Sequence, residues 1–127
     1  MTRFQEGDWV HIEHHGPHFA VVLRIRSERA IVLYGTSRER NVERVEVLPQ
    51  SADGIRLSLT WPTYFYPANC IPMPLAKLKP KGRRCPPRLL ATLHLLCQRQ
   101  LGEMGSMHDA QLDALAEEMA ERGIKPR

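Results

Sequence analysis

Short segments with the residue patterns of β-strands fill the first 80 residues. HFAVVLRIR (18–26) and RAIVLYGT (29–36) are β-branched and apolar, which favours strands. WVHIEH (9–14), VERVEVL (42–48) and GIRLSLTW (54–61) alternate between apolar and polar positions with a two-residue period. Such alternation predicts strands that bury one face. Ser27 and Glu28 separate residues 18–26 from residues 29–36 and predict a tight hairpin turn. Five or six short strands at this spacing favour a small, strongly bent barrel over a flat sheet.

Two of these strands carry further predictions. In residues 9–14 we expect Val10 and Ile12 on one face, with Trp9 and His11 on the other. The proline-rich segment ANCIPMPLAKL (68–78) can only be an edge strand or an extended segment, because proline cannot donate to a strand ladder.

Helical periodicity takes over after Pro86 and Pro87, which suit a first helical turn. Leucines recur on one face of residues 88–101, and Gly102 and Gly105 end that helix. Ser106 opens a second, acidic helix that ends at Gly123. We therefore predict a mainly β fold followed by two α-helices, with residues 1–101 as the barrel and closing helix and residues 102–127 as a C-terminal acidic extension.

Charge is distributed unevenly along the 127 residues, whose formal net charge is +4. Residues 1–50 hold seven basic and seven acidic side chains, whereas residues 51–101 hold eight basic side chains against Asp53 alone. Residues 102–127 hold three basic and six acidic side chains. The middle segment is therefore where a polyanion would be attracted.

Composition narrows the class of protein. Three cysteines without a CxxC pair argue against a disulfide framework or a cysteine-based zinc site. No apolar run has the length of a membrane span, and the N-terminus lacks a signal peptide's apolar segment. We expect a cytoplasmic protein with no membrane partner.

The order of several short motifs resembles the PemK/MazF toxin family. The matching stretches are Gly7-Asp8-Trp9-Val10, Pro17 to Leu23, Gly35-Thr36-Ser37-Arg38 and Pro62-Thr63-Tyr64-Phe65. The resemblance spans roughly residues 4–101. It implies an SH3-like barrel that acts as a homodimeric, metal-independent endoribonuclease without cofactors, paired with an acidic antitoxin.

The resemblance also implies a site at the mouth of the barrel. The family has a basic residue, usually in an Arg-Pro pair, at the start of the second strand, and a Thr or Ser at the end of the third. Thr36 and Ser37 meet the second requirement, but His18-Phe19 replaces Arg-Pro. Histidine can transfer a proton near neutral pH, yet it lacks the permanent, forked donors of a guanidinium. We take His18, Thr36 and Ser37 as the candidate catalytic residues.

Further residues are candidates for binding nucleic acid. Arg24, Arg38 and Arg40 could neutralise phosphate near this mouth. A basic run precedes the helix, and a cluster of aromatic residues offers rings for stacking unpaired bases. The run contains Lys77, Lys79, Lys81, Arg83, Arg84 and Arg88, and the rings are Trp61, Tyr64, Phe65 and Tyr66. The basic run could equally be a solvated surface loop, and we expect at least half of these rings to fill the core.

Two other features have competing interpretations. The histidines at 11, 14, 15 and 18 could gather a metal, but a solvated polar loop is the expectation, because nothing in the spacing makes them converge. The acidic last helix could pack within the chain, fold over the basic run, or contact a partner.

These observations lead to two hypotheses. The first is a PemK/MazF-like endoribonuclease acting on single-stranded RNA. The second is a catalytically silent SH3-like binding protein that holds nucleic acid or another polyanion, or inhibits a protein machine, for instance from a mobile element.

Overall fold

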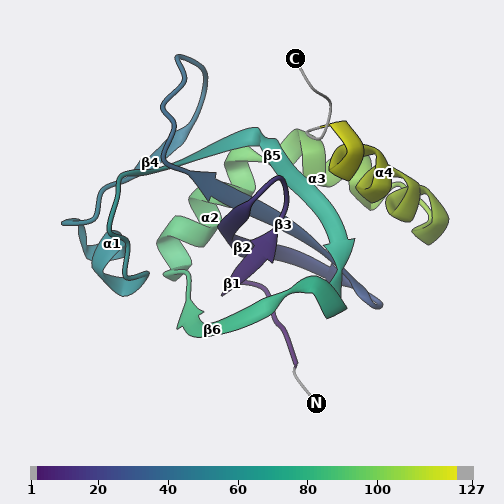
Figure 1. Ribbon diagram of the computed structural model, residues 1–127, viewed down its shortest axis with the longest axis horizontal. Helices are drawn as coiled ribbons and strands as arrows, with labels where there is room; N and C mark the ends of the chain where they lie inside the picture. The colour runs from purple at the N-terminus through teal and green to yellow at the C-terminus, as the bar shows by residue number, and fades with distance from the viewer. Residues whose placement is uncertain (1–2, 123–127) are drawn as a thin grey trace.

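A six-stranded antiparallel sheet forms the centre of the computed structural model, which describes residues 3–122 (Figure 1). The strands lie in the order β4-β5-β3-β2-β1-β6. Their bounds are β1 (Asp8–Glu13), β2 (Pro17–Arg26), β3 (Arg29–Thr36), β4 (Val45–Val47), β5 (Thr63–Pro74) and β6 (Lys79–Arg84). The helices are α1 (Ala52–Arg56), the 3-10 helix η1 (Leu75–Lys77), α2 (Pro87–Leu96), α3 (Gln98–Gly105) and α4 (Asp109–Arg122). The predicted bent sheet is therefore confirmed at the level of a curled antiparallel sheet.

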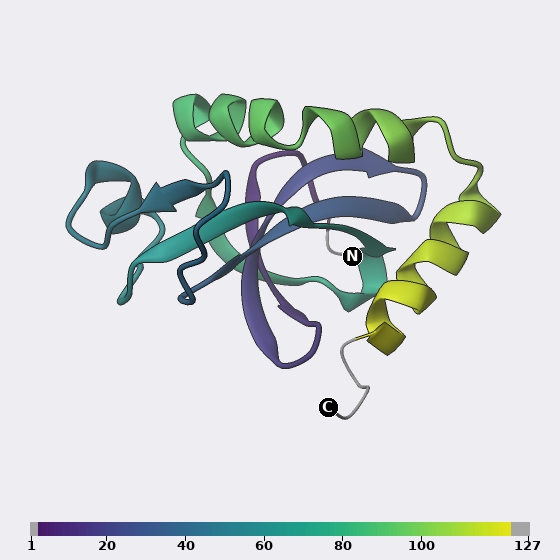
Figure 2. The ribbon, with the colours of Figure 1, turned by 90° about the horizontal axis from the view of Figure 1, so that it is seen from above.

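Both faces of this sheet are buried, which gives the molecule two apolar clusters. Val10 and Ile12 belong to the cluster on one face, and Trp9 belongs to the other, as the alternation along β1 predicts. The cluster around Trp9 is closed by α2 and α3, which run end to end across that face (Figure 2). Leu93 and Leu101 carry this packing. The other cluster lies on the inner side of the curled sheet, where partly buried side chains also pack against it, among them Phe4, Leu75 of η1 and Met119 of α4.

Bulges explain why the sheet curls. The pairing between β2 and β3 shifts between Val22 and Arg24, and the pairing between β3 and β5 shifts between Leu33 and Gly35. A bulge bends a strand and increases its twist. Between these shifts, the β2–β3 hairpin turns at Ser27 and Glu28, as predicted, with Arg26 opposite Arg29. Because the two strands are antiparallel, the start of β2 lies beside the end of β3.

The proline-containing part of β5 is an edge, as predicted. Residues 70–74 pair with β3 on one side, while β4 pairs only with residues 63–65. Helix α4 packs along β5, so the helix shields a strand edge that would otherwise expose unpaired backbone groups.

Helix α4 is fixed in place by arginines from the β2–β3 hairpin. Arg29 makes a two-pronged contact of 2.8 Å with each carboxylate oxygen of Asp113, and it lies 3.3 Å from Asp109. Arg26 contacts Asp109 and the carbonyls at the end of α3. The apolar side of α4 inserts Leu112 into the larger cluster. Of the roles considered for the acidic helix, packing within the chain is therefore the one observed, and it does not cover the β6 cations.

Two predictions of secondary structure were wrong, and one predicted strand was too long. Residues 54–61 do not form a strand, because Ser51 caps α1 by accepting a hydrogen bond from the Gly54 amide at 3.0 Å. Gly54 also lies against Leu48, where a Cβ atom would be only 2.0 Å from the carbonyl oxygen. Residues 79–84 of the basic run, for which a solvated loop was one open interpretation, form the edge strand β6.

The second error concerns the closing helix, which is interrupted at Cys97. The backbone there leaves helical dihedral angles, with φ −102° and ψ 14°, so the predicted single helix is α2 followed by α3. The predicted strand over residues 42–48 is also shorter, as β4 has three residues. Within residues 3–122, no helix combines the length and the apolar composition needed to cross a membrane.

The burial of Leu112 predicts that α4 stabilises the whole fold. Leu112 is 2% exposed, so Leu112→Ala should lower the free energy of unfolding by about 2–4 kcal/mol, through lost apolar burial and the cavity left behind. Leu95→Ala is the matched control, because Leu95 is 72% exposed on α2. Urea unfolding measures both. Equal, negligible losses would mean that α4 is detached from the core in solution.

Candidate functional site

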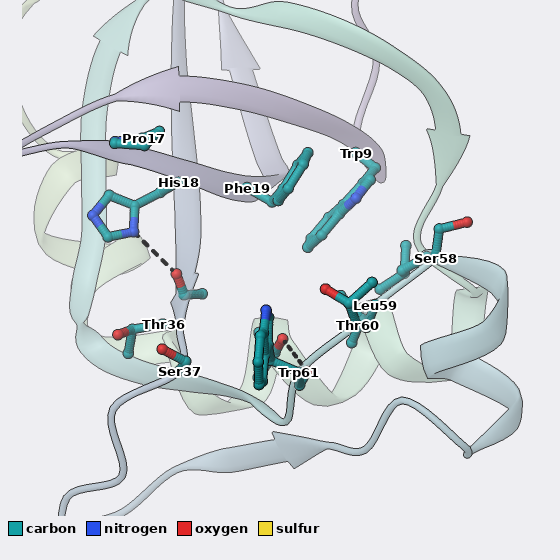
Figure 3. Close-up of a pocket in the computed structure, with 13 residues that line it drawn as sticks. Trp9, Pro17, His18, Phe19, Thr36, Ser37, Ser58, Leu59, Thr60 and Trp61 are labelled. Atoms are coloured by element: carbon teal, nitrogen blue, oxygen red, sulfur yellow. Dashed lines mark hydrogen bonds between the residues drawn. The ribbon is translucent and has the colours of Figure 1, made fainter.

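An open pocket of about 290 Å³ lies where the start of β2 meets the end of β3 (Figure 3). Loop residues 57–61, which follow α1, form its other side. The residues that line it are Trp9, Pro17, His18, Phe19, Gly35, Thr36, Ser37, Leu57, Ser58, Leu59, Thr60, Trp61 and Thr63. Among these lining residues, His18 is the single side chain that commonly acts as an acid or a base. The other polar side chains carry hydroxyl or indole N–H groups, and none is a carboxylate. The lining is therefore apolar and hydroxyl-rich, with one titratable base.

His18 is oriented by a hydrogen bond across the strand pair. Its Nδ1–H donates to the carbonyl oxygen of Gly35 at 3.2 Å. A carbonyl can only accept, so this contact places the proton of a neutral ring on Nδ1 and leaves Nε2 as a base. The ring also lies 4.5 Å from that of Tyr34, centroid to centroid. The structure therefore selects one tautomer of His18.

Because Gly35 has no side chain, β3 and β5 can approach each other closely at this point. A Cβ atom on residue 35 would lie 2.4 Å from the Thr63 methyl group. The next two residues, Thr36 and Ser37, present their hydroxyls at the pocket below His18 (Figure 3). Thr36 Oγ1 accepts a hydrogen bond from the Arg38 amide at 3.2 Å, which leaves its O–H group able to donate to a ligand. The three candidate catalytic residues thus share one pocket.

An aromatic wall stands beside His18. Phe19 stacks on Trp9 with ring centroids 5.5 Å apart and an interplanar angle of 9°. Trp9 is 2% exposed and fixed by the core, whereas Phe19 is 43% exposed. The Lys81 ammonium lies 5.9 Å from the centre of the Phe19 ring. Phe19 therefore supplies part of the pocket surface.

The cations of the basic run fall into two groups. Arg84 has structural partners, because its guanidinium contacts Asp8 at 2.7 Å and the Glu6 carbonyl at 2.7 Å. Arg83 donates to the Arg56 carbonyl at 3.1 Å and so ties β6 to α1. In the part of the chain described, Lys79 and Lys81 form no ion pair and are exposed on β6. These two lysines are the cations left to meet an anion beside Phe19.

Several other predicted binding residues do not line this pocket. Arg24 lies in a separate cavity between α2 and α3, and Lys77 lies in a cavity beside α4. Tyr64 is buried, with the Arg44 guanidinium 5.8 Å from its ring centre. Arg40 lies 5.9 Å from the ring centre of Tyr66. Arg38, exposed next to Ser37, is the arginine that borders the site.

Tyr66 is a residue whose role the sequence did not reveal. Its buried hydroxyl donates to the Arg38 carbonyl at 2.8 Å and accepts from the Arg40 amide at 2.5 Å. These two bonds hold the arginine-bearing loop after Ser37. Tyr64, Phe65 and Tyr66 are all buried and Trp61 is exposed, so the expectation that half or more of this cluster fills the core is confirmed.

The histidine-rich turn contacts α4, with residues 15–17 exposed and His14 partly buried. The His14 and His15 rings lie 4.1 Å apart, and His15 Nε2 donates to the Met119 carbonyl at 2.9 Å. Burial, and then the proximity of His15 and His18, lower the pKa of His14 to about 4. Across residues 3–122, no group of three or more His, Cys, Asp or Glu side chains is arranged to hold a metal ion.

Comparisons with protein-family models, with curated proteins and with solved structures find no match to this chain.

The lowered pKa of His14 predicts a loss of stability in mild acid. Between pH 6.5 and pH 4, the unfolded chain binds a proton at His14 that the native state does not bind, so the free energy of unfolding falls as pH falls. Partial solvent exposure reduces the effect, and we expect a loss of about 1–2 kcal/mol from pH 7 to pH 5.

Urea unfolding at the two pH values tests this prediction. His14→Gln should remove most of that loss, and His108→Gln, at an exposed position, should retain it. An identical pH dependence in the parent and in His14→Gln would contradict the assignment.

Proposed function

We propose that this chain is a PemK/MazF-like protein with an SH3-like barrel that binds single-stranded RNA at the pocket around His18. The observation that carries the proposal is the hydrogen bond from His18 to Gly35, which joins the start of β2 to the end of β3. The family resemblance requires these two strand ends to meet. The resemblance adds a homodimer, an acidic antitoxin and a cytoplasmic location to the proposal.

The chemistry of the pocket favours RNA as the ligand. Its lining holds no carboxylate, and cations stand on its rim from two elements, Lys81 on β6 and Arg38 after β3. Phosphates are attracted by such a rim, and exposed rings offer stacking surfaces that a paired duplex cannot use. Hydroxyls at Thr36 and Ser37 can donate to phosphate or ribose oxygens. A single-stranded RNA could contact the cations, the rings and the hydroxyls at the same time.

A second candidate function is metal-independent cleavage of that RNA, and the tautomer of His18 favours it. The 2′-hydroxyl would attack the adjacent phosphorus while Nε2 of His18 takes its proton. The bond to the 5′-oxygen then breaks, and that oxygen takes a proton from water, while the proton on His18 Nε2 returns to solvent. The products are a 2′,3′-cyclic phosphate and a 5′-hydroxyl. No arginine lines the pocket, so the negative charge on the phosphate would be neutralised by Arg38, which stands on the rim. If cleavage fails, the lack of an arginine inside the pocket favours the silent binding protein.

Binding should depend on the β6 lysines. Lys81→Glu should weaken binding to a single-stranded RNA about tenfold or more at low salt, and should flatten the salt dependence, because a phosphate contact is replaced by repulsion. Fluorescence anisotropy with a labelled oligonucleotide measures both quantities. Arg99→Glu is the matched control, since it makes the same charge change on α3, away from the pocket. Equal weakening by both variants would mean that only net charge matters.

Cleavage should depend on His18. In the presence of a chelator, the parent should cut single-stranded RNA to cyclic-phosphate ends, and His18→Asn should slow cutting about a hundredfold or more, because the general base is lost. Asparagine keeps a donor for the Gly35 carbonyl, so the strand pair should persist. Intact RNA after long incubation at high parent concentration would reject cleavage. Tight, salt-sensitive binding without cutting would then identify a silent binding protein.

A further inference from the structure

Trp61 is exposed to an unusual degree for the largest type of apolar side chain. It is 70% exposed, whereas the other tryptophan, Trp9, is buried. Trp61 stands at the end of the 57–61 loop, and its indole nitrogen points toward Phe19 and Trp9 across the pocket (Figure 3). Exposed tryptophans at a pocket are typical of binding sites, because they supply a large rigid surface together with one hydrogen-bond donor.

The wall opposite Trp61 is preformed. Trp9 and Phe19 lie on paired strands, and their parallel stack is anchored by the core. Within this lining, Leu57 is buried and roots the loop that carries Trp61. Ring surfaces on both sides therefore border the pocket before any ligand arrives, so little ordering is needed on binding.

The groups between these walls suit a flat, neutral, hydrogen-bonding ring. Thr60 directs its hydroxyl into the pocket (Figure 3), and Ser37 lies at its edge, so both offer groups that can donate or accept. The pocket volume of about 290 Å³ is at the lower limit for ligand sites, which fits one ring system and not a stretch of chain. Lys81 and Arg38 at the rim add attraction for a phosphate attached to such a ring.

We propose that the pocket is a seat for one unpaired nucleobase, which stacks on the indole of Trp61 and directs its polar edge to the hydroxyl of Thr60, which points into the pocket (Figure 3). This inference rests on the proposed binding of single-stranded RNA and deepens it. The phosphate beside the seated base lies toward Lys81 or Arg38. The base seat gives the protein a preference at one position of the strand, because the Thr60 hydroxyl contacts the edge of that base alone.

Tryptophan fluorescence tests the seat directly, since Trp61 is exposed and Trp9 is buried. Saturating the parent with a five-nucleotide single-stranded RNA should quench the emission of Trp61. In Trp61→Phe the quenching should vanish while the RNA still binds, because phenylalanine keeps a stacking face. Trp61→Leu should weaken binding about tenfold, and Leu95→Ala, which also trims an exposed apolar side chain, should leave binding unchanged. Circular dichroism checks that each variant is folded.

Oligonucleotides that lack one base distinguish binding of a base in the pocket from binding of the RNA backbone alone. An abasic residue at the seated position should weaken binding as much as Trp61→Leu does, and the two losses should not add. If RNA binds but neither change weakens it, the base seat is rejected and the proposed function stands. If the parent binds no RNA, both proposals are rejected. Quenching by an aromatic peptide without any RNA binding would assign the pocket to a protein ligand and overturn the seat.

Discussion

The antiparallel pairing of β2 with β3 is the constraint on which the rest of the structure depends. It brings the start of one strand beside the end of the other, and the hydrogen bond from His18 to the Gly35 carbonyl closes that end. The bulge near Gly35 turns β3 toward the first part of β5, and the absence of a side chain on Gly35 lets Thr63 approach. The pairing of β2 with β3 therefore determines the strand register, the curl of the sheet and the position of the pocket. The candidate site is built from the sheet itself.

The opposite end of the same hairpin organises the C-terminal part of the chain. Arg26 and Arg29, next to the turn, hold α4 through Asp109 and Asp113. Exposed ion pairs contribute little by themselves, so we assign most of the docking energy to the buried Leu112 and use the arginines to explain the orientation of the helix. Asp109 and Asp113 of the acidic helix are thus paired with arginines of the hairpin. The β6 lysines remain accessible to an external anion.

The local pattern of apolar and polar residues was enough to predict the elements whose sequence allows a single interpretation. The β2–β3 hairpin follows from two apolar, β-branched runs on either side of Ser27 and Glu28. The two faces of β1 follow from alternation, and the edge character of β5 follows from its prolines. The error at residues 54–61 arose because Ile55, Leu57 and Leu59 alternate like a strand, whereas Ser51 as a helix cap and the tight contact of Gly54 decide for a helix. The candidate site was predictable only through the family resemblance. The base seat was not, since Trp61 faces Phe19 only after the loop and the hairpin come together in three dimensions.

The ring of His18 offers the most direct test of the central claim. Nitrogen-15 NMR of the histidine rings, near neutral pH and without ligand, reports which nitrogen of His18 carries the proton, and nuclear Overhauser contacts report whether its ring lies against Gly35. The account predicts an Nδ1–H tautomer with contacts from the ring to the Gly35 and Tyr34 protons. A rapidly exchanging ring in the Nε2–H tautomer, without contacts to the end of β3, would contradict it.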